Sequence, residues 1–95
     1  MIGEFFEAAR KGEQYNIEKL LSMKIPVDVR NSRGETALME AALWRHTKIC
    51  QTLLDHGANP RLENRHGENA LVYAKDGERP DTIELIRKAI RKSKR

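Results

Sequence analysis

His46 and Cys50 are the residues whose types and spacing come nearest to a metal-binding pair. They stand four positions apart in a stretch with helical periodicity, so their side chains would share one helix face. Imidazole nitrogen and thiolate sulfur are both zinc ligands, but a structural zinc site takes four ligands. A single cysteine provides no metal framework by itself. We therefore expect no metal site and no cofactor.

Catalytic motifs give no support for an enzyme. The chain has no glycine-rich phosphate loop, no HExxH and no GxSxG elbow. Carboxylate pairs such as Glu4 and Glu7 stand in a charged helical stretch, where solvated ion pairs explain them. We therefore expect a non-enzymatic protein with no catalytic residues.

The basic tail, residues 87–95, has six of the 18 Lys and Arg residues and no acidic one. The six cations are Arg87, Lys88, Arg91, Lys92, Lys94 and Arg95. They could neutralise the phosphates of nucleic acid or another polyanion. A solubilising helix end or a linker explains the same charges, and no aromatic stacking residue or base-reading motif stands nearby. Polyanion binding by the tail is therefore the alternative function, less favoured than a protein partner.

Composition indicates a small protein with a thin core. Of the 95 residues, 39% are hydrophobic, 5% aromatic and 34% charged, which fits an elongated fold with a small aliphatic core. No apolar run approaches the roughly 20 residues that span a bilayer, and no secretory leader is recognisable. We expect a cytoplasmic monomer without a membrane segment.

A polar turn occurs twice, as NSRGETAL at 31–38 and as NRHGENAL at 64–71, which is a constant offset of 33 residues. Because a fixed period predicts a repeat architecture, the offset defines one domain of three units, about 1–30, 31–63 and 64–90, followed by the tail. Extending it aligns apolar and small residues of all three units. The aligned sets are Phe5, Leu38 and Leu71; Ala8, Ala41 and Ala74; Ile17, Cys50 and Ile83; and Leu20, Leu53 and Ile86.

Apolar residues spaced three or four apart predict two short helices in each unit. The first helices are expected at 5–11, 35–44 and 68–75, and the second helices at 16–23, 47–56 and 81–90. Thr36 and Asn69 are predicted N-caps, Gly57 a helix stop, and Pro80 a first-turn residue.

The polar turns are expected to link the units. Gly34 and Gly67 would supply backbone conformations that other residues avoid. Asn31 and Asn64 would bond to the backbone of their own turns.

The second unit, GETALMEAALWRHTKICQTLLDHGANP, resembles an ankyrin repeat. TALMEAA stands for the family's TPLHxAA and LLDHGA for its LLxxGA. The resemblance implies an all-α solenoid of three helix-turn-helix units joined by β-hairpin-like turns, which binds a partner protein through its concave face. It also implies that His46 bonds to backbone between helices. Cys50 aligns with Ile17 and Ile83, which makes it a core position.

Departures from the family pattern concentrate in the terminal units. Lys24 replaces the glycine that ends a helix in the first unit. In the third unit Arg87 replaces a leucine and Ile90 the glycine, so the last helix should continue into the tail. Polar replacements are expected where a terminal unit has no neighbour to cover it.

The candidate partner-binding residues are positions that vary between units on the surface that the family uses. They are Arg30, Ser32, Arg33, Leu43, Trp44, Glu63, Arg65, His66 and Asp76. Leu43 and Trp44 are predicted to form an exposed apolar pair at the end of a first helix, on the side facing the hairpins, with the composition of a binding hot spot. The alternative is that Trp44 packs over its own scaffold or an adjacent unit.

Overall fold

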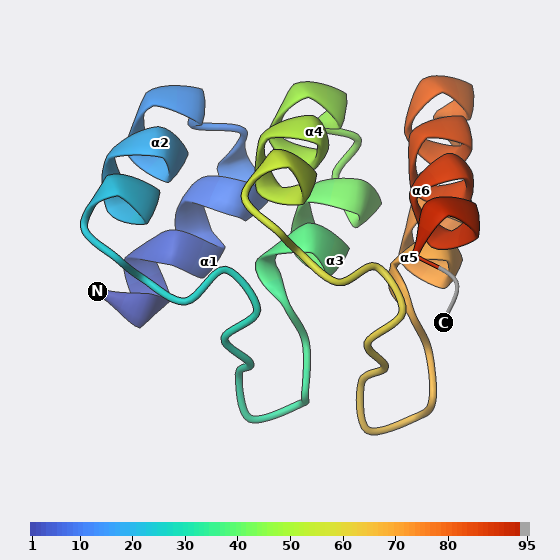
Figure 1. Cartoon of the computed structure of the whole chain (residues 1–95). Coiled ribbons are helices and arrows are strands. Elements are labelled where there is room, and N and C mark those ends of the chain that lie inside the picture. Colours follow the sequence, from blue (N-terminus) through green and yellow to red (C-terminus); the bar gives the residue numbers. More distant parts are fainter. Residues whose placement is uncertain (94–95) are drawn as a thin grey trace.

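The structure, a computed structural model, describes residues 1–93, and this part of the chain forms six helices (Figure 1). The predicted all-α solenoid of three helix-turn-helix units is confirmed. The helices are α1 (Ile2–Lys11), α2 (Gln14–Ser22), α3 (Ala37–Leu43), α4 (Thr47–Asp55), α5 (Ala70–Gly77) and α6 (Pro80–Lys92). Within residues 1–93, no helix is long and apolar enough to cross a membrane.

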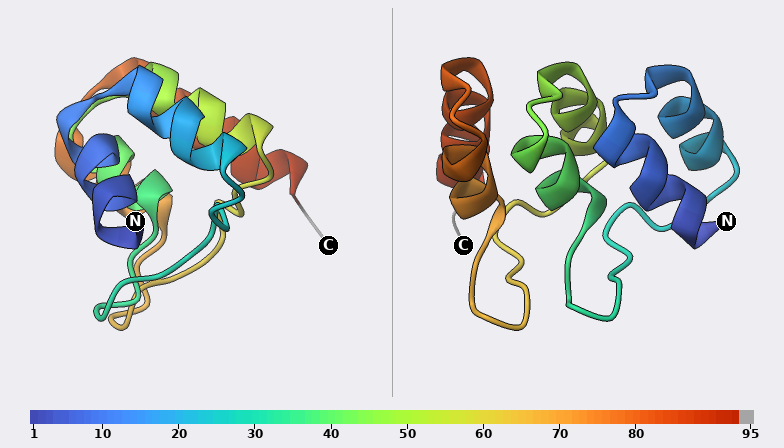
Figure 2. Two further views of the ribbon diagram at one scale, coloured as in Figure 1. Left: turned by 90° about the vertical axis from the view of Figure 1, so that its left-hand side faces the viewer. Right: turned by 180° about the vertical axis from the view of Figure 1, so that it is seen from behind.

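The helices form two layers. The inner layer consists of α1, α3 and α5, the outer layer of α2, α4 and α6, and neighbouring helices pack within and between layers. Two loops, residues 30–36 and 63–69, project in the same direction beyond the inner helices (Figure 2). We call these the hairpin loops. The concave face consists of the hairpin loops and the exposed side of the inner helices.

The core follows the 33-residue period. Ala8, Ala41 and Ala74 are all essentially buried, and these small side chains let the inner helices approach closely. Cys50 on α4 is completely buried in the hydrophobic core, as its alignment with isoleucines predicts. Ile83 in the last unit is only partly buried, because no further unit covers it.

Helix ends are set by the predicted residues. The Thr36 hydroxyl accepts a hydrogen bond from the Met39 amide at 3.3 Å, and the Asn69 side chain accepts from the Leu71 amide at 3.0 Å. Pro80 begins α6, where its missing N–H removes no helical bond. As predicted from Ile90, α6 continues into the tail and ends at Lys92.

The hairpin loops are built alike. Gly34 and Gly67 have φ values of 78° and 77°, in the left-handed region that favours glycine. The Asn31 side-chain oxygen accepts from its own loop's Arg33 and Glu35 amides at 2.9 and 3.0 Å. Asn64 makes the corresponding bonds in the second loop. The repeated letters of the turn therefore encode its backbone.

Candidate protein-binding surface

A shallow groove of about 330 Å³ lies between the two hairpin loops. The two loops are joined there by the Arg65 amide, which donates to the Arg33 carbonyl at 3.1 Å. Both side chains are exposed. The groove brings together four predicted partner-binding residues from two units, and these are Arg30, Ser32, Glu63 and Arg65. Arg33 and His66 are exposed in the same loops.

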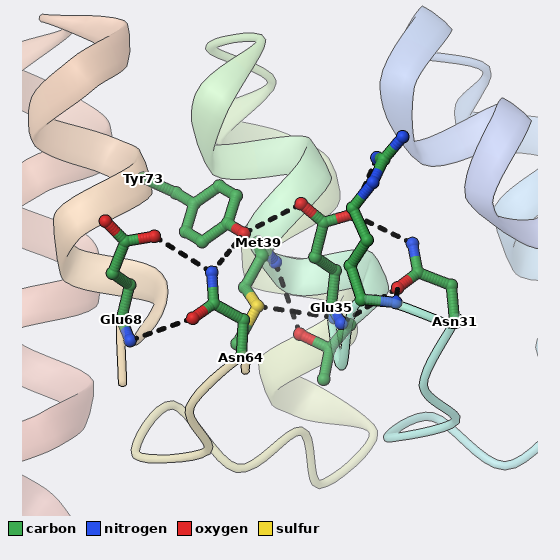
Figure 3. Close-up of polar contacts among 8 residues, drawn as sticks. Asn31, Glu35, Met39, Asn64, Glu68 and Tyr73 are labelled. Carbon is green, nitrogen blue, oxygen red and sulfur yellow. Dashed lines mark hydrogen bonds and ion pairs between the residues drawn. The ribbon is translucent and has the colours of Figure 1, made fainter. Parts of the chain in front are cut away.

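Each hairpin loop holds its own carboxylate in place. Asn31 donates to Glu35 Oε1 at 2.8 Å, and Asn64 donates to Glu68 Oε1 at 2.9 Å (Figure 3). Arg33 also lies 3.5 Å from Glu35 Oε1. The two repeated glutamates are thus scaffold residues, each with its Oε1 bonded to the asparagine of its own loop.

Tyr73 connects the two loops and was not among the predicted residues. Its hydroxyl donates to Glu35 Oε2 at 2.8 Å and accepts from Asn64 Nδ2 at 2.8 Å (Figure 3). Burial raises the pKa of Tyr73 to about 12, the Asn64 bond opposes this rise, and the Glu35 carboxylate adds to it. The phenol therefore stays protonated and keeps its donor. The sequence could have identified Tyr73 through the 33-residue offset, which aligns it with Glu7 and Glu40 and so shows that it occupies a variable position of the inner helices.

The second group of predicted residues lies at the other end of the inner helices. Trp44 is the C-cap of α3 and is 51% exposed, and Asp76 is exposed near the end of α5. Two expectations need correction here. Leu43 is partly buried and packs against the core, so the exposed apolar pair reduces to Trp44. Trp44 is also separated from the loop of Arg33 by the length of α3, about 10 Å for seven residues.

Gly77, which the offset pairs with Trp44, is a packing residue. A Cβ on Gly77 would lie 2.7 Å from the Leu43 carbonyl oxygen and 2.8 Å from that of Ala42. The ends of α3 and α5 are thus in close backbone contact. This contact brings the stretch that ends in Asp76 next to the end of α3, where Trp44 follows.

Glu40 lies between the two groups and was also missed from the sequence. It is half-buried on α3, one helical turn before Trp44. Burial, and then the Glu35 carboxylate, raise the pKa of Glu40, against the opposing effects of Arg10, the Trp44 side chain and Arg33. These neighbours come from the first hairpin loop and from the C-terminal ends of α1 and α3, so Glu40 lies within electrostatic reach of both groups.

His46 and Cys50 have structural surroundings. His46 Nε2 lies 2.9 Å from the Arg10 carbonyl oxygen and donates to it, so the ring links two units as the family resemblance implied. Burial raises the pKa of the Cys50 thiol to about 12, which disfavours the thiolate that a metal would need. Residues 1–93 contain no group of three or more His, Cys, Asp or Glu side chains that could hold a metal ion.

The basic tail is divided by its geometry. Arg87 and Arg91 lie 3.6 and 3.7 Å from the two carboxylate oxygens of Glu84 on the same helix. Lys88 and Lys92 instead line a groove between α4 and α6. Lys94 and Arg95 lie outside the described residues. The predicted set thus faces more than one direction, and Glu84 partly neutralises it.

Comparisons with known proteins agree with this architecture. A family profile for ankyrin repeats (3 copies) matches residues 5–95. An ankyrin repeat-containing protein of Treponema pallidum is 38% identical over 80 residues, which are 84% of this chain and 27% of that protein. The human Notch-regulated ankyrin repeat-containing protein is 33% identical over 90 residues, which cover 90% of this chain and 79% of that protein.

Two solved structures share the fold. The human ASB11 ankyrin repeat domain superposes with a TM-score of 0.86 at 22% identity, over 90% of this chain and 38% of that one. A chain from the Bdellovibrio bacteriovorus predatory endopeptidase Bd0816 in complex with immunity protein Bd3460 gives a TM-score of 0.85 at 32% identity. That match covers 90% of this chain and 45% of the other. The match of the family profile to residues 5–95 and the three stacked helix pairs together show that the present chain belongs to the ankyrin-repeat family.

Proposed function

We propose that this protein is a non-enzymatic module that binds a partner protein through its concave face. Ankyrin repeats generally mediate protein–protein interaction, and the fold is typically a non-enzymatic interaction module. One structural relative comes from a complex between an endopeptidase and an immunity protein, which supports the choice of a protein as partner. We also propose that the protein acts as a cytoplasmic monomer, which cell fractionation and analytical ultracentrifugation would test.

The exposure of Trp44 is the observation that carries this proposal. Trp44 is the only tryptophan of the chain, and about half of its surface, 51%, is open to solvent. Packing over its own scaffold therefore leaves much of the indole unused. Glu40 lies one helical turn before Trp44. The exposed Asp76 precedes Gly77, whose backbone contacts the end of α3, so polar groups lie on the same side of the molecule. A tryptophan that becomes buried in an interface, with polar contacts around it, is typical of the residues that dominate binding free energy.

The hairpin loops extend the proposed surface. Arg30, Ser32, Arg33, Glu63, Arg65 and His66 differ between the two loops within an otherwise repeated frame. The frame itself is held by Asn31 and Asn64, so the variable side chains sit on a rigid support. A rigid support lowers the ordering cost of binding.

Capture of partners from a native lysate, followed by affinity measurement on the purified complex, tests the proposal. Trp44→Ala should weaken the complex by about 2 kcal/mol, roughly 30-fold, while the unfolding free energy stays near that of the wild type. Tyr15→Ala is the matched control, because Tyr15 is 74% exposed on α2 in the outer layer. Equal weakening by both variants, or none by Trp44→Ala, would refute concave-face binding.

A further inference from the structure

The outer layer has a second groove, of about 420 Å³, between α4 and α6. Its lining has five apolar residues, two lysines and no carboxylate. The apolar ones are Leu54, Ala58, Pro60, Leu85 and Ala89, the lysines are Lys88 and Lys92, and Gln51 and Ser93 complete the lining. Leu54, Leu85 and Ala89 are only partly buried, so the floor of the groove presents apolar surface to solvent.

The chain provides an internal reference for this groove, because α2 and α4 meet in the same way one unit earlier. At an offset of 33 residues, α4 and the residues that follow it present polar or acidic side chains to that earlier junction. Thr52 corresponds to Leu85, Asp55 to Lys88, His56 to Ala89, and Asn59 to Lys92. On the opposite side, Ile25 corresponds to Ala58. The α4–α6 junction is therefore more apolar and more cationic than its counterpart, and Ala58 and Ala89 leave more room in its floor than Ile25 and His56 do.

The two junctions place their side-chain hydrogen bonds at different points. Across the α2–α4 junction, Gln14 Nε2 donates to Thr52 Oγ1 at 2.8 Å. Across the α4–α6 junction, the hydroxyl of Thr47, which corresponds to Gln14, lies 2.6 Å from that of Thr82. Leu85 takes the place of Thr52 in the next junction and cannot accept such a bond. The fold alone does not require leucine in place of threonine at this position, since an adjacent helix pair of the same fold accepts threonine.

The lysines of the groove are available for an outside partner. Within residues 1–93, neither Lys88 nor Lys92 has a carboxylate within 4.0 Å, whereas Arg87 and Arg91 on the same helix pair with Glu84. The two lysines are four positions apart and share one face of α6. Each can lay its aliphatic stem along the apolar floor and extend its ammonium to the rim.

The end of the groove is held in place by Arg61. Its guanidinium donates to the Ser93 hydroxyl at 2.9 Å and to the Ile90 carbonyl at 3.1 Å. Ser93 itself donates to the Ile90 carbonyl at 2.9 Å. These bonds satisfy the Ile90 carbonyl, one of those that a helix end leaves free, and tie the last turn of α6 to Arg61.

We propose that this groove binds an acidic amphipathic segment of a partner protein. The apolar side chains of that segment pack on Leu54, Leu85 and Ala89, and its carboxylates pair with Lys88 and Lys92. Charge complementarity and the apolar floor together select this occupant. A polyanion such as nucleic acid would use the two lysines but gain nothing from the floor. The site lies in the outer layer, so it is separate from the concave face proposed above.

A pair of labelled helical peptides tests the proposal by fluorescence anisotropy. One peptide has leucines on one face and glutamates on the other; in the second peptide serine replaces every leucine. The full chain should bind the leucine peptide at least tenfold more tightly than the serine peptide and than a short DNA duplex. Equal binding of the two peptides, or tighter binding of the duplex, would overturn it.

Charge-reversal and floor-filling variants locate the site. Lys88→Asp with Lys92→Asp should weaken the leucine peptide at least tenfold, while Lys19→Asp with Lys75→Asp, which changes the net charge equally, should not. Ala89→His fills the floor with the residue that the earlier junction uses, and it should weaken binding without charge removal. Urea unfolding checks that each variant is folded. NMR amide shifts on peptide addition provide a second measurement of the site. Shifts confined to the concave face, or tight peptide binding by folded Ala89→His, would refute the groove as the site.

Discussion

The hydroxyl of Tyr73 on α5 donates to Glu35 Oε2 in the first hairpin loop, 2.8 Å away and 38 residues earlier in the chain. Tyr73 is only 8% exposed, and its hydroxyl also accepts from Asn64 in the second loop. One phenol therefore joins the two hairpin loops to an inner helix. This bond holds together the part of the concave face that carries the exposed Arg33 and Arg65.

Removing the hydroxyl tests this link. Tyr73→Phe should lower the unfolding free energy by about 1–2 kcal/mol, because both Glu35 and Asn64 lose a partner in a shielded place. Urea unfolding measures the loss. Tyr15→Phe is the control and should change stability by less than about 0.5 kcal/mol, since Tyr15 is 74% exposed. An unchanged midpoint for Tyr73→Phe would show that the bond contributes nothing to stability.

The pH dependence of stability should separate two glutamates. Burial alone would raise the pKa of Glu35, but the bonds from Asn31 and Tyr73, together with Arg33, outweigh it and leave the pKa below 4.5. The contribution of Glu35 to stability is therefore present above pH 4.5 and disappears as the pH falls through the lower folded pKa. The advantage of the wild type over Glu35→Gln should shrink accordingly in acid.

Glu40 should behave in the opposite way. Burial and the neighbouring Glu35 carboxylate raise the pKa of Glu40 above its ordinary 4.5, so its ionised form disfavours folding. Glu40→Gln should stabilise the protein at neutral pH, and the gain should vanish below pH 4.5. Unfolding curves of both glutamine variants across this range provide the measurement. The same pH trend in both variants would contradict the different surroundings of the two carboxyls.

Gly77→Ala should destabilise the protein by about 1–3 kcal/mol, because the new methyl group would lie 2.7 Å from the Leu43 carbonyl oxygen. Helix propensity alone predicts the reverse, a gain of up to about 1 kcal/mol. Gly3→Ala is the matched substitution, since a Cβ on Gly3 in α1 meets nothing within 4 Å. A stabilising effect at both glycines would show that α3 and α5 can move apart.

Lys24→Gly should stabilise the protein, because Lys24 has a φ of 72° in place of the family's helix-ending glycine. The expected gain is about 1 kcal/mol, the cost of a left-handed conformation for a residue with a Cβ. Gly57→Ala is the reciprocal test at the aligned position, with a φ of 93° and open space around the new methyl. It should lose a similar amount, and thermal or urea unfolding of both variants decides the matter.

Much of the scaffold follows from the sequence because its causes are local. Local neighbours determine the roles of the caps Thr36 and Asn69 and of the loop residues Asn31 and Gly34. Their predicted roles are confirmed in the structure. The 33-residue period is visible because these local signals recur. The variable positions of the hairpin loops could be named for the same reason, since they stand out against a repeated frame.

Contacts between units depended on the tertiary structure. Tyr73 and Glu35, or Gly77 and Leu43, meet only when the units are stacked with a particular rotation and spacing. The 33-residue period fixes which residues are equivalent, but it does not specify that rotation. Consequently the sequence by itself determined the family, the helices and the rigid hairpin frame. Only the tertiary structure decided that Leu43 packs against the core while Trp44 stays exposed, and that α4 and α6 leave an apolar, lysine-lined groove.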